Sequence, residues 1–229
     1  MVIIKDVIES SFIDYPKKIS IVLFTAGCNF QCHYCHNPEL VNPEPPFLTE
    51  EKTMKIINEK KEWIDGVVIT GGEPTLHNDL PQFIKKIKKE YGLLIKLDTN
   101  GSKPEMIKKL LDEELLDFIA MDVKAPIEKY EEITCTKIDA QKIKQSIELI
   151  KQSNIEYEFR TTIVPKLLSE EDILKIGYLL NGAKTLVLQT FKNNKTLDKE
   201  YQKQPSYLKP QMEHFARILK QFIKNVQTR

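Results

Sequence analysis

Three of the four cysteines in the chain, Cys28, Cys32 and Cys35, lie within one short segment and have the spacing C-x3-C-x2-C. Cysteine thiolates grouped in this way hold iron–sulfur clusters, and a closed [4Fe–4S] cluster takes four of them. A cluster held by only three cysteines keeps one iron open to an outside ligand. The spacing therefore predicts a [4Fe–4S] cluster that takes part in catalysis.

A zinc site is the alternative use of these cysteines. Structural zinc takes four ligands, often supplied as two well-separated pairs. His33 or His36 would have to complete the set, and both are so close to the cysteines that wrapping a tetrahedron around one ion would strain the loop. The segment therefore favours the iron–sulfur cluster over zinc.

A second candidate segment is Gly71-Gly72-Glu73, which follows the apolar run 67–70. Two adjacent glycines let the backbone approach a ligand closely, and the Glu73 carboxylate can accept hydrogen bonds from an ammonium group. A double-glycine turn taken alone is more often a plain loop.

These segments sit within an alternation of strand and helix patterns, which predicts an α/β fold with a parallel sheet. Strands are expected at 19–25, 67–70, 93–98, 118–123, 157–164 and 185–190. Helices are expected at 50–61, 80–91, 104–111, 140–153 and 170–180, and a last helix begins near Pro210 and carries the apolar stripe Phe215, Ile218, Leu219, Phe222 and Ile223. A full barrel has eight strand–helix units in about 250 residues, so this pattern predicts a partial (β/α)6 TIM-like barrel.

Strand alternation places charged side chains near the predicted cluster. Successive strand residues point to opposite faces, so Asp122 and Lys124 share a face, as do Lys96 and Asp98. If these side chains and Arg160 face the interior of the barrel, they meet at the carboxyl ends of the strands, where βα barrels carry their active sites. A set of structural ion pairs is the alternative.

Composition is consistent with one globular enzyme. With 229 residues, of which 41% are hydrophobic, the chain can bury one substantial core. We expect residues 1–229 to form a single domain, with a barrel core at 19–190 and a C-terminal loop and helix at 191–229. The 34 Lys and Arg residues nearly balance the 33 Asp and Glu residues, so no charge excess indicates binding to nucleic acid or a membrane.

The cysteine count indicates the compartment. Cys135 is the only cysteine outside the C-x3-C-x2-C segment, so a disulfide framework would consume the predicted cluster ligands. No apolar run approaches membrane-spanning length, and the first residues lack the pattern of a signal peptide. We therefore expect a reducing cytoplasm and no membrane partner.

The cysteine spacing, the aromatic Tyr34 before the third cysteine and the Gly71-Gly72-Glu73-Pro74 segment together resemble the radical S-adenosylmethionine (SAM) superfamily. The resemblance implies the partial barrel and a cluster whose open iron binds SAM and whose reduction cleaves it to a 5'-deoxyadenosyl radical. It also implies SAM-binding roles: Gly71, Gly72 and Glu73 for the methionyl amino group, Lys124 and Arg160 for the carboxylate, and Tyr34 for the adenine.

A narrower resemblance, to the glycyl-radical-enzyme activases, covers nearly the whole chain. It rests on Asp14-Tyr15-Pro16, Leu97-Asp98-Thr99-Asn100-Gly101 and Met121-Asp122-Val123-Lys124, among other segments. The likeness is greatest to the anaerobic ribonucleoside-triphosphate reductase activating proteins, in the branch related to pyruvate formate-lyase activase. It implies a protein substrate, the partner glycyl radical enzyme, which loses a glycine Cα hydrogen, and a flavodoxin or ferredoxin-type reductant.

The same resemblance implies a monovalent cation beside the SAM carboxylate. Its ligands would be Asp98, Thr99, Asp122 and the Val123 carbonyl, and oxygen ligands suit a hard cation. Alternatively, the carboxylates pair with Lys124 and Arg160 and hold no metal.

The chain also departs from its apparent relatives. The lyase activases carry Asp-Gly-Pro-Gly where this chain has Asp14-Tyr15-Pro16-Lys17, and Cys135 stands where a glycine is expected. The segment 192–210 lacks periodicity and is expected to be a loop that helps to receive the partner.

Two other functions stay open from the sequence. One is a radical SAM enzyme that acts on a small molecule, like the 7-carboxy-7-deazaguanine synthases, since such an enzyme shares the cysteine spacing. The other is a non-enzymatic metal-binding module in which the cysteines only staple a loop.

Overall fold

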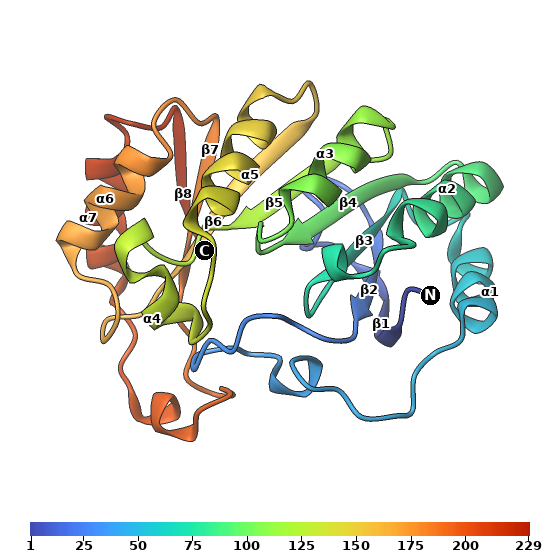
Figure 1. The fold of residues 1–229 in the computed structure, drawn as a ribbon, viewed down its shortest axis with the longest axis horizontal. Coiled ribbons are helices and arrows are strands. Elements are labelled where there is room, and N and C mark those ends of the chain that lie inside the picture. The colour runs from blue at the N-terminus through green and yellow to red at the C-terminus, as the bar shows by residue number, and fades with distance from the viewer.

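The computed structural model describes every residue from Met1 to Arg229, and its centre is one curved sheet in which the strands follow chain order (Figure 1). The strand β1 pairs with β2 antiparallel, and every later pair is parallel. The strands are β1 (Ile4–Ser11), β2 (Ser20–Thr25), β3 (Gly66–Gly71), β4 (Leu94–Thr99), β5 (Phe118–Asp122), β6 (Glu156–Ile163), β7 (Thr185–Thr190) and β8 (Asn225–Thr228).

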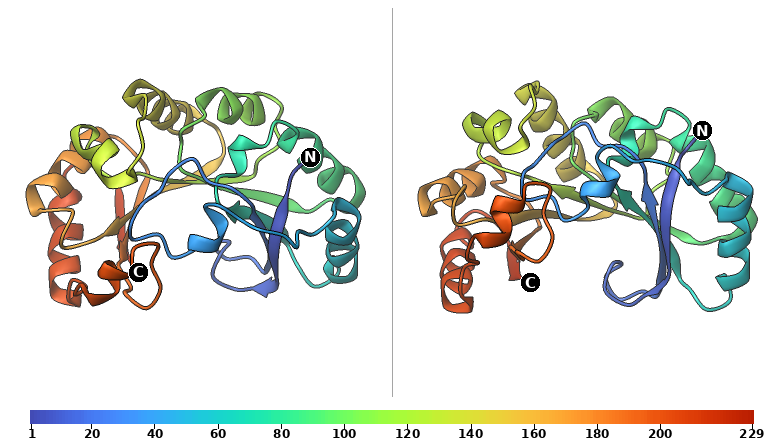
Figure 2. Two further views of the ribbon diagram at one scale, coloured as in Figure 1. Left: turned by 60° about the horizontal axis from the view of Figure 1, so that its bottom comes forward. Right: turned by 90° about the horizontal axis from the view of Figure 1, so that it is seen from below.

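Helices cover the outer side of the curved sheet, as both views in Figure 2 show. They are α1 (Glu50–Lys60), α2 (Leu80–Tyr91), α3 (Pro104–Asp112), α4 (Tyr130–Thr134), α5 (Ala140–Gln152), α6 (Glu170–Leu179) and α7 (Lys209–Leu219). Short 3-10 helices are η1 (Pro38–Leu40), η2 (Pro74–Leu76), η3 (Ile127–Lys129) and η4 (Lys199–Lys203). The main core, a cluster of 51 buried residues, includes the apolar side chains packed between sheet and helices. None of these helices combines the length and the apolar character needed to cross a lipid bilayer.

The prediction of an α/β fold built on a partial (β/α)6 barrel is confirmed, because β2 to β7 form six parallel strands with helical connections. The predicted boundaries agree with these elements to within one or two residues. The strands β1 and β8 were not predicted; β1 alternates irregularly because its pairing with β2 contains register shifts. The division into a single domain with a core at 19–190 stays a prediction.

The last helix is shorter than its apolar stripe indicated. The helix α7 ends at Leu219, so Phe222 and Ile223 lie beyond it. Phe222 instead packs against Tyr178, with ring centroids 4.4 Å apart, and beside Gly177 on α6. The helix length predicted from the i, i+3, i+4 pattern was wrong here, because the turn after a helix can place apolar residues on the same surface as the helix itself.

The inner side of the sheet has an apolar end and a polar end. At the amino ends of the strands, Tyr15 is only 5% exposed and lies in a small cluster with Val22 and Val68. Its ring centroid is 5.9 Å from that of Phe118, at the start of β5. Burial raises the pKa of Tyr15 to about 12, so the hydroxyl stays neutral. The Asp14-Tyr15-Pro16 segment therefore closes the bottom of the barrel.

We expect Tyr15→Ala to lower the free energy of unfolding by about 3 kcal/mol, because removal of this large buried ring leaves a cavity at the amino ends of the strands. Urea denaturation of the variant and the wild type would measure the loss. Trp63→Ala is the matched control, since Trp63 is 78% exposed. Equal losses in the two variants would contradict the proposed packing role of Tyr15.

Candidate active site

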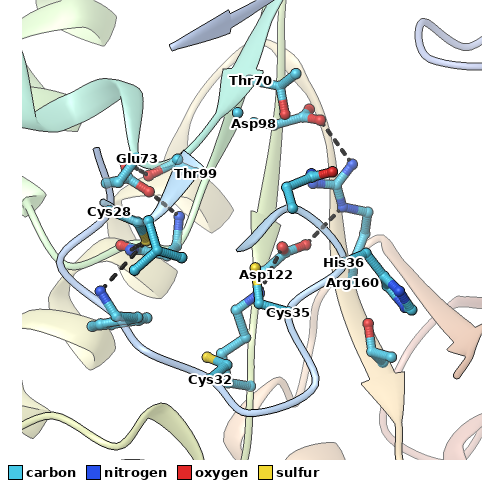
Figure 3. A pocket seen from close by; sticks show the side chains of 18 of the residues that line it. Cys28, Cys32, Cys35, His36, Thr70, Glu73, Asp98, Thr99, Asp122 and Arg160 are labelled. Carbon is cyan, nitrogen blue, oxygen red and sulfur yellow. Dashed lines mark hydrogen bonds and ion pairs between the residues drawn. The ribbon is translucent and has the colours of Figure 1, made fainter. Parts of the chain in front are cut away.

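The predicted site residues meet in one cavity of about 260 Å³ at the carboxyl ends of the strands (Figure 3). The cavity is bordered by the loop between β2 and η1, here named the cysteine loop (residues 26–37). The predicted residues that line the cavity are Cys28, Cys32, Tyr34, Cys35, Gly71, Gly72, Glu73, Asp98, Thr99, Asp122, Lys124 and Arg160. Val123 does not line it and is fully buried.

Backbone contacts fix the cysteine loop against the end of β3. The amide of Glu73 donates to the Gly27 carbonyl at 2.8 Å, and the amide of Gly27 donates to Leu40 at 2.9 Å. A Cβ on Gly72 would collide with the Gly27 carbonyl oxygen, and Gly71 has a φ of +116° that side chains rarely adopt. Both glycines are therefore required where the β3 turn passes the cysteine loop.

The segment after β7 packs against the other side of the cysteine loop. The amides of Leu197 and Asp198 donate to the Cys35 and His33 carbonyls at 3.0 and 2.9 Å. The His33 ring stacks on Tyr201, with centroids 5.7 Å apart, and His36 Nδ1 is 2.9 Å from the Lys195 carbonyl oxygen. Both histidines near the cysteines thus contact this segment. The sequence predicted a loop here that helps to receive the partner, and that role stays a prediction.

The three thiols fit a polynuclear cluster better than one metal ion. No group of three His, Cys, Asp or Glu side chains is arranged to hold a single ion. Each cysteine in a [4Fe–4S] cluster binds a different iron, so the thiolates need only face a common space. Tyr34 supplies a further sign of a bound group, because its buried hydroxyl has no hydrogen-bond partner in the chain.

Burial controls the charge of the free thiols. It raises the pKa of Cys28 to about 11 and the pKa of Cys32 to about 12. Without metal, both side chains are therefore neutral near pH 7. Binding of iron displaces these protons, since the thiolate is the ligand.

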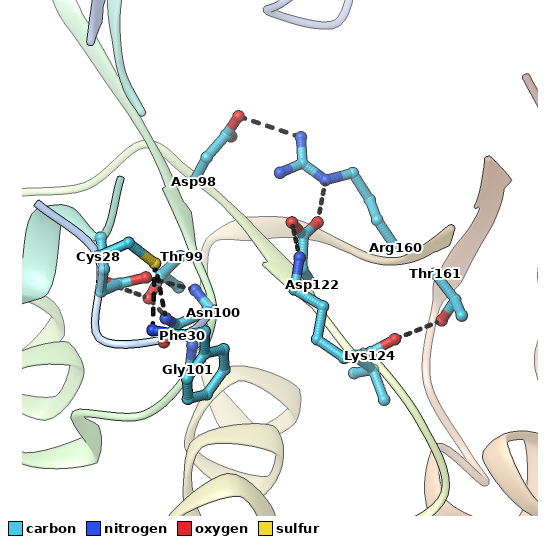
Figure 4. Close-up of polar contacts among 12 residues, drawn as sticks. Cys28, Phe30, Asp98, Thr99, Asn100, Gly101, Asp122, Lys124, Arg160 and Thr161 are labelled. Atoms are coloured by element: carbon cyan, nitrogen blue, oxygen red, sulfur yellow. Dashed lines mark hydrogen bonds and ion pairs between the residues drawn. The ribbon is translucent and has the colours of Figure 1, made fainter. Parts of the chain in front are cut away.

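Lys96, Asp98, Asp122, Lys124 and Arg160 form an ion-pair network on the inner side of the sheet. Figure 4 shows all of them except Lys96. Arg160 donates from Nε to Asp122 at 2.8 Å and from Nη1 to Asp98 at 3.1 Å. Lys124 Nζ is 2.8 Å from Asp122, and Lys96 pairs with Asp98. The prediction that these side chains share the barrel interior agrees with this arrangement.

The network determines the ionisation of its carboxyl groups. Burial alone would raise the pKa of Asp98 and of Asp122, but the facing Arg160 guanidinium, helped by the neighbouring lysines, holds both pKa values below their usual range. The negative charges are therefore kept at neutral pH. The network contains three basic and two acidic groups, which leaves one positive charge in excess beside the cavity.

Glu73 organises two loops by accepting hydrogen bonds on both carboxylate oxygens. Its Oε1 accepts from the amide of Thr75 at 3.0 Å and from the hydroxyl of Thr99 at 2.7 Å, and its Oε2 accepts from the amide of Asn100 at 2.6 Å. The side chain is fully buried, and burial raises its pKa despite these donors. The sequence indicated an acceptor for an ammonium, and that role stays a prediction beside these hydrogen bonds within the chain.

Sequence reasoning missed Asn100 as a contact of the cysteine loop. Its side-chain amide donates to Asn29 Oδ1 at 2.9 Å and lies 4.0 Å from Cys28 Sγ. Thr162 and Gln189 also line the cavity and were not singled out. The alternation of side chains along a strand could have identified them. Thr162, for example, lies two residues after Arg160 on β6 and therefore points to the same inner face.

Comparisons with known proteins agree with this geometry. The pattern of the radical SAM superfamily matches residues 22–176. A Methanocaldococcus jannaschii protein named as a glycyl-radical enzyme activating enzyme is 36% identical over 98% of this chain and 94% of its own length. A second such protein from that organism is 32% identical over 71% of this chain and 63% of its own.

A solved structure supports the fold. Streptococcus suis SuiB, bound to its precursor peptide SuiA, superposes with a TM-score of 0.71 at 12% sequence identity. The match covers 91% of this chain and 48% of SuiB, so the chain spans about half the length of that protein.

We expect Asp122→Asn to lower the free energy of unfolding by about 3 kcal/mol at pH 7, because Arg160 and Lys124 then share a buried site with one carboxylate fewer. The folded-state pKa of Asp122 is depressed, so its contribution is fully present above the unfolded pKa, about 3.9, and is lost as the pH falls through the folded pKa. The difference between variant and wild type should therefore shrink below about pH 4. Urea denaturation across this range would measure it.

The control for this experiment is Asp112→Asn. Asp112 pairs with Lys108, but both side chains are more than half exposed. The control should change stability little at any pH. A pH-independent loss in Asp122→Asn would contradict the role given to the network.

Proposed function

Because the chain belongs to the radical SAM superfamily, in the family of glycyl-radical enzyme activating enzymes, we propose that it takes a hydrogen atom from a glycine Cα of a partner glycyl radical enzyme. Its cofactors are a [4Fe–4S] cluster and SAM. The observation that carries the proposal is that three thiols, two adjacent glycines and a group of basic side chains border one cavity. The chain also aligns with an activating enzyme over nearly its whole length.

Cys28, Cys32 and Cys35 are the proposed cluster ligands. When bound, the cluster and SAM supply a reductive cleavage that produces a hydrogen-abstracting radical. Cys32 and Tyr34 are only 6% and 4% exposed, so this part of the cavity wall is shielded from solvent by the chain.

The other lining residues would bind and orient SAM. The backbone at Gly71 and Gly72 borders the cavity without a side chain, and its carbonyl groups would accept hydrogen bonds from the methionyl amino group. Lys124 and Arg160 bring the excess positive charge of the network to its carboxylate through charge-assisted hydrogen bonds. Tyr34 would pack near the adenine. Glu73 also holds the loops after β3 and β4 in place.

The proposed partner is an anaerobic ribonucleoside-triphosphate reductase, with a flavodoxin or ferredoxin-type protein as reductant. The balanced charge of the chain favours a protein partner over nucleic acid or a membrane surface. We place this reaction in the cytoplasm, where free cysteines stay reduced.

The test is an anaerobic electron paramagnetic resonance experiment with cluster-loaded protein, reductant, SAM and the reductase. We expect a glycyl radical signal on the reductase that depends on SAM and disappears in Cys32→Ala, because that variant lacks a cluster ligand.

Cys135→Gly is the matched control. Cys135 is the remaining cysteine, and its φ of +52° lies in the left-handed region that favours glycine, so the substitution removes a thiol without strain. It should keep the wild-type signal. Formation of 5'-deoxyadenosine without a glycyl radical would point to another partner or to a small-molecule substrate. Absence of both cluster and cleavage would contradict the radical SAM assignment itself.

A further inference from the structure

Lys96 is a buried charge that the proposed reaction does not yet use. It lies on β4, its side chain is 1% exposed, and it does not line the cavity. Its ammonium pairs with Asp98 and lies 5.8 Å from the centre of the Phe118 ring. A lysine is almost never buried so fully without a specific partner, and here that partner is a carboxylate that borders the cavity.

With Lys96 included, the carboxylates of the network have a basic partner at every oxygen. Asp98 Oδ1 faces Lys96 and its Oδ2 faces Arg160. Asp122 Oδ1 faces Arg160 and its Oδ2 faces Lys124. No negative charge in the network is left for a metal cation to neutralise.

The remaining oxygen atoms of the predicted cation site also have partners within the chain. The Thr99 hydroxyl donates to Glu73 at 2.7 Å and accepts from the Gly101 amide at 3.1 Å, and the Val123 carbonyl accepts from the Thr161 hydroxyl at 2.9 Å. A cation between Asp98 and Asp122 would compete with the four ion pairs of the network and add a positive charge to a group that already has one in excess, and so these residues do not fit it. The alternative left open by the sequence, in which the carboxylates pair with basic residues, agrees with these contacts.

We propose that Lys96 is a built-in counter-ion and a positioning residue, and that the SAM site of this chain therefore works without a monovalent metal cation. Lys96 neutralises Asp98, Asp98 holds Arg160, and Arg160 meets the SAM carboxylate. The proposal rests on the SAM-binding part of the proposed function and is independent of the identity of the partner.

The first experiment uses the wild-type, cluster-loaded protein. SAM affinity is measured by calorimetric titration in potassium chloride, in sodium chloride and in N-methylglucamine chloride at one ionic strength. We expect the three dissociation constants to agree within about twofold, because no metal cation contributes to the site. Thallium-205 NMR with Tl⁺ as a potassium probe should show no saturable bound signal, with or without SAM.

Variants then separate the charge of Lys96 from its volume. Lys96→Met keeps most of the volume, and we expect it to weaken SAM binding by about tenfold through the displaced Arg160. Lys96→Ala leaves a space beside Asp98, and we expect ethylammonium ions to restore part of its SAM affinity. Lys86→Met is the matched control, since Lys86 lies on the surface of α2 and pairs only with Glu50.

The outcomes are distinct. A wild-type SAM affinity that falls at least about fivefold without potassium or sodium, or a saturable Tl⁺ signal, would overturn the counter-ion proposal while leaving the radical SAM function intact. Unchanged SAM affinity in Lys96→Met would overturn the positioning role. If Lys96→Met does not fold, the wild-type cation series still decides the proposal. Failure of the wild type to bind SAM in any salt would instead count against the proposed function.

Discussion

The cavity depends on the guanidinium of Arg160, because this one group connects three neighbouring strands. From β6 it binds Asp122 on β5 and Asp98 on β4. Parallel pairing sets Asp122 opposite Arg160, so the first contact follows from the register of the sheet. Asp98 and Arg160 are only 12% and 13% exposed, and neither charge could be left alone there without a large free-energy cost. The contacts of Arg160 therefore determine both the spacing of these three strand ends and the ionisation of the carboxyl groups in the site.

The opposite wall of the cavity depends on backbone packing instead of charge. Gly72 passes so close to Gly27 that no side chain fits between them, and the Glu73 carboxylate then binds Thr99 and Asn100. The loops after β2, β3 and β4 therefore behave as one unit. Because Asn100 also lies beside Cys28, the positions of the cysteines and of the β4 turn are coupled. A change in either loop should therefore shift both the cluster ligands and the Gly71-Gly72 backbone proposed to bind SAM.

Much of this arrangement could be predicted from the sequence, because its strongest signals are local. The cysteine spacing indicated the cluster loop, and strict strand alternation placed Asp122 and Lys124 on one face. The bonds from Glu73 to Thr99 and Asn100 could not be predicted in this way, since Thr99 ends another strand, Asn100 follows it, and these bonds arise only on folding. The packing of Leu197 and Asp198 on the cysteine loop was missed for the same reason. The edge strand β1 was missed because irregular pairing hides its alternation.

The polar and apolar ends of the barrel are linked through Lys96. Below it, Phe118 and Tyr15 fill the inner side with aromatic rings, so the ammonium cannot be hydrated from that direction. In surroundings of low polarity an unpaired charge is costly, and an ion pair with good geometry is correspondingly strong. Asp98 is then held by Lys96 from below and by Arg160 from the side. Tyr15, at the far end of the barrel, therefore supports the site by packing on the Phe118 ring that shields the charge on which Asp98 depends.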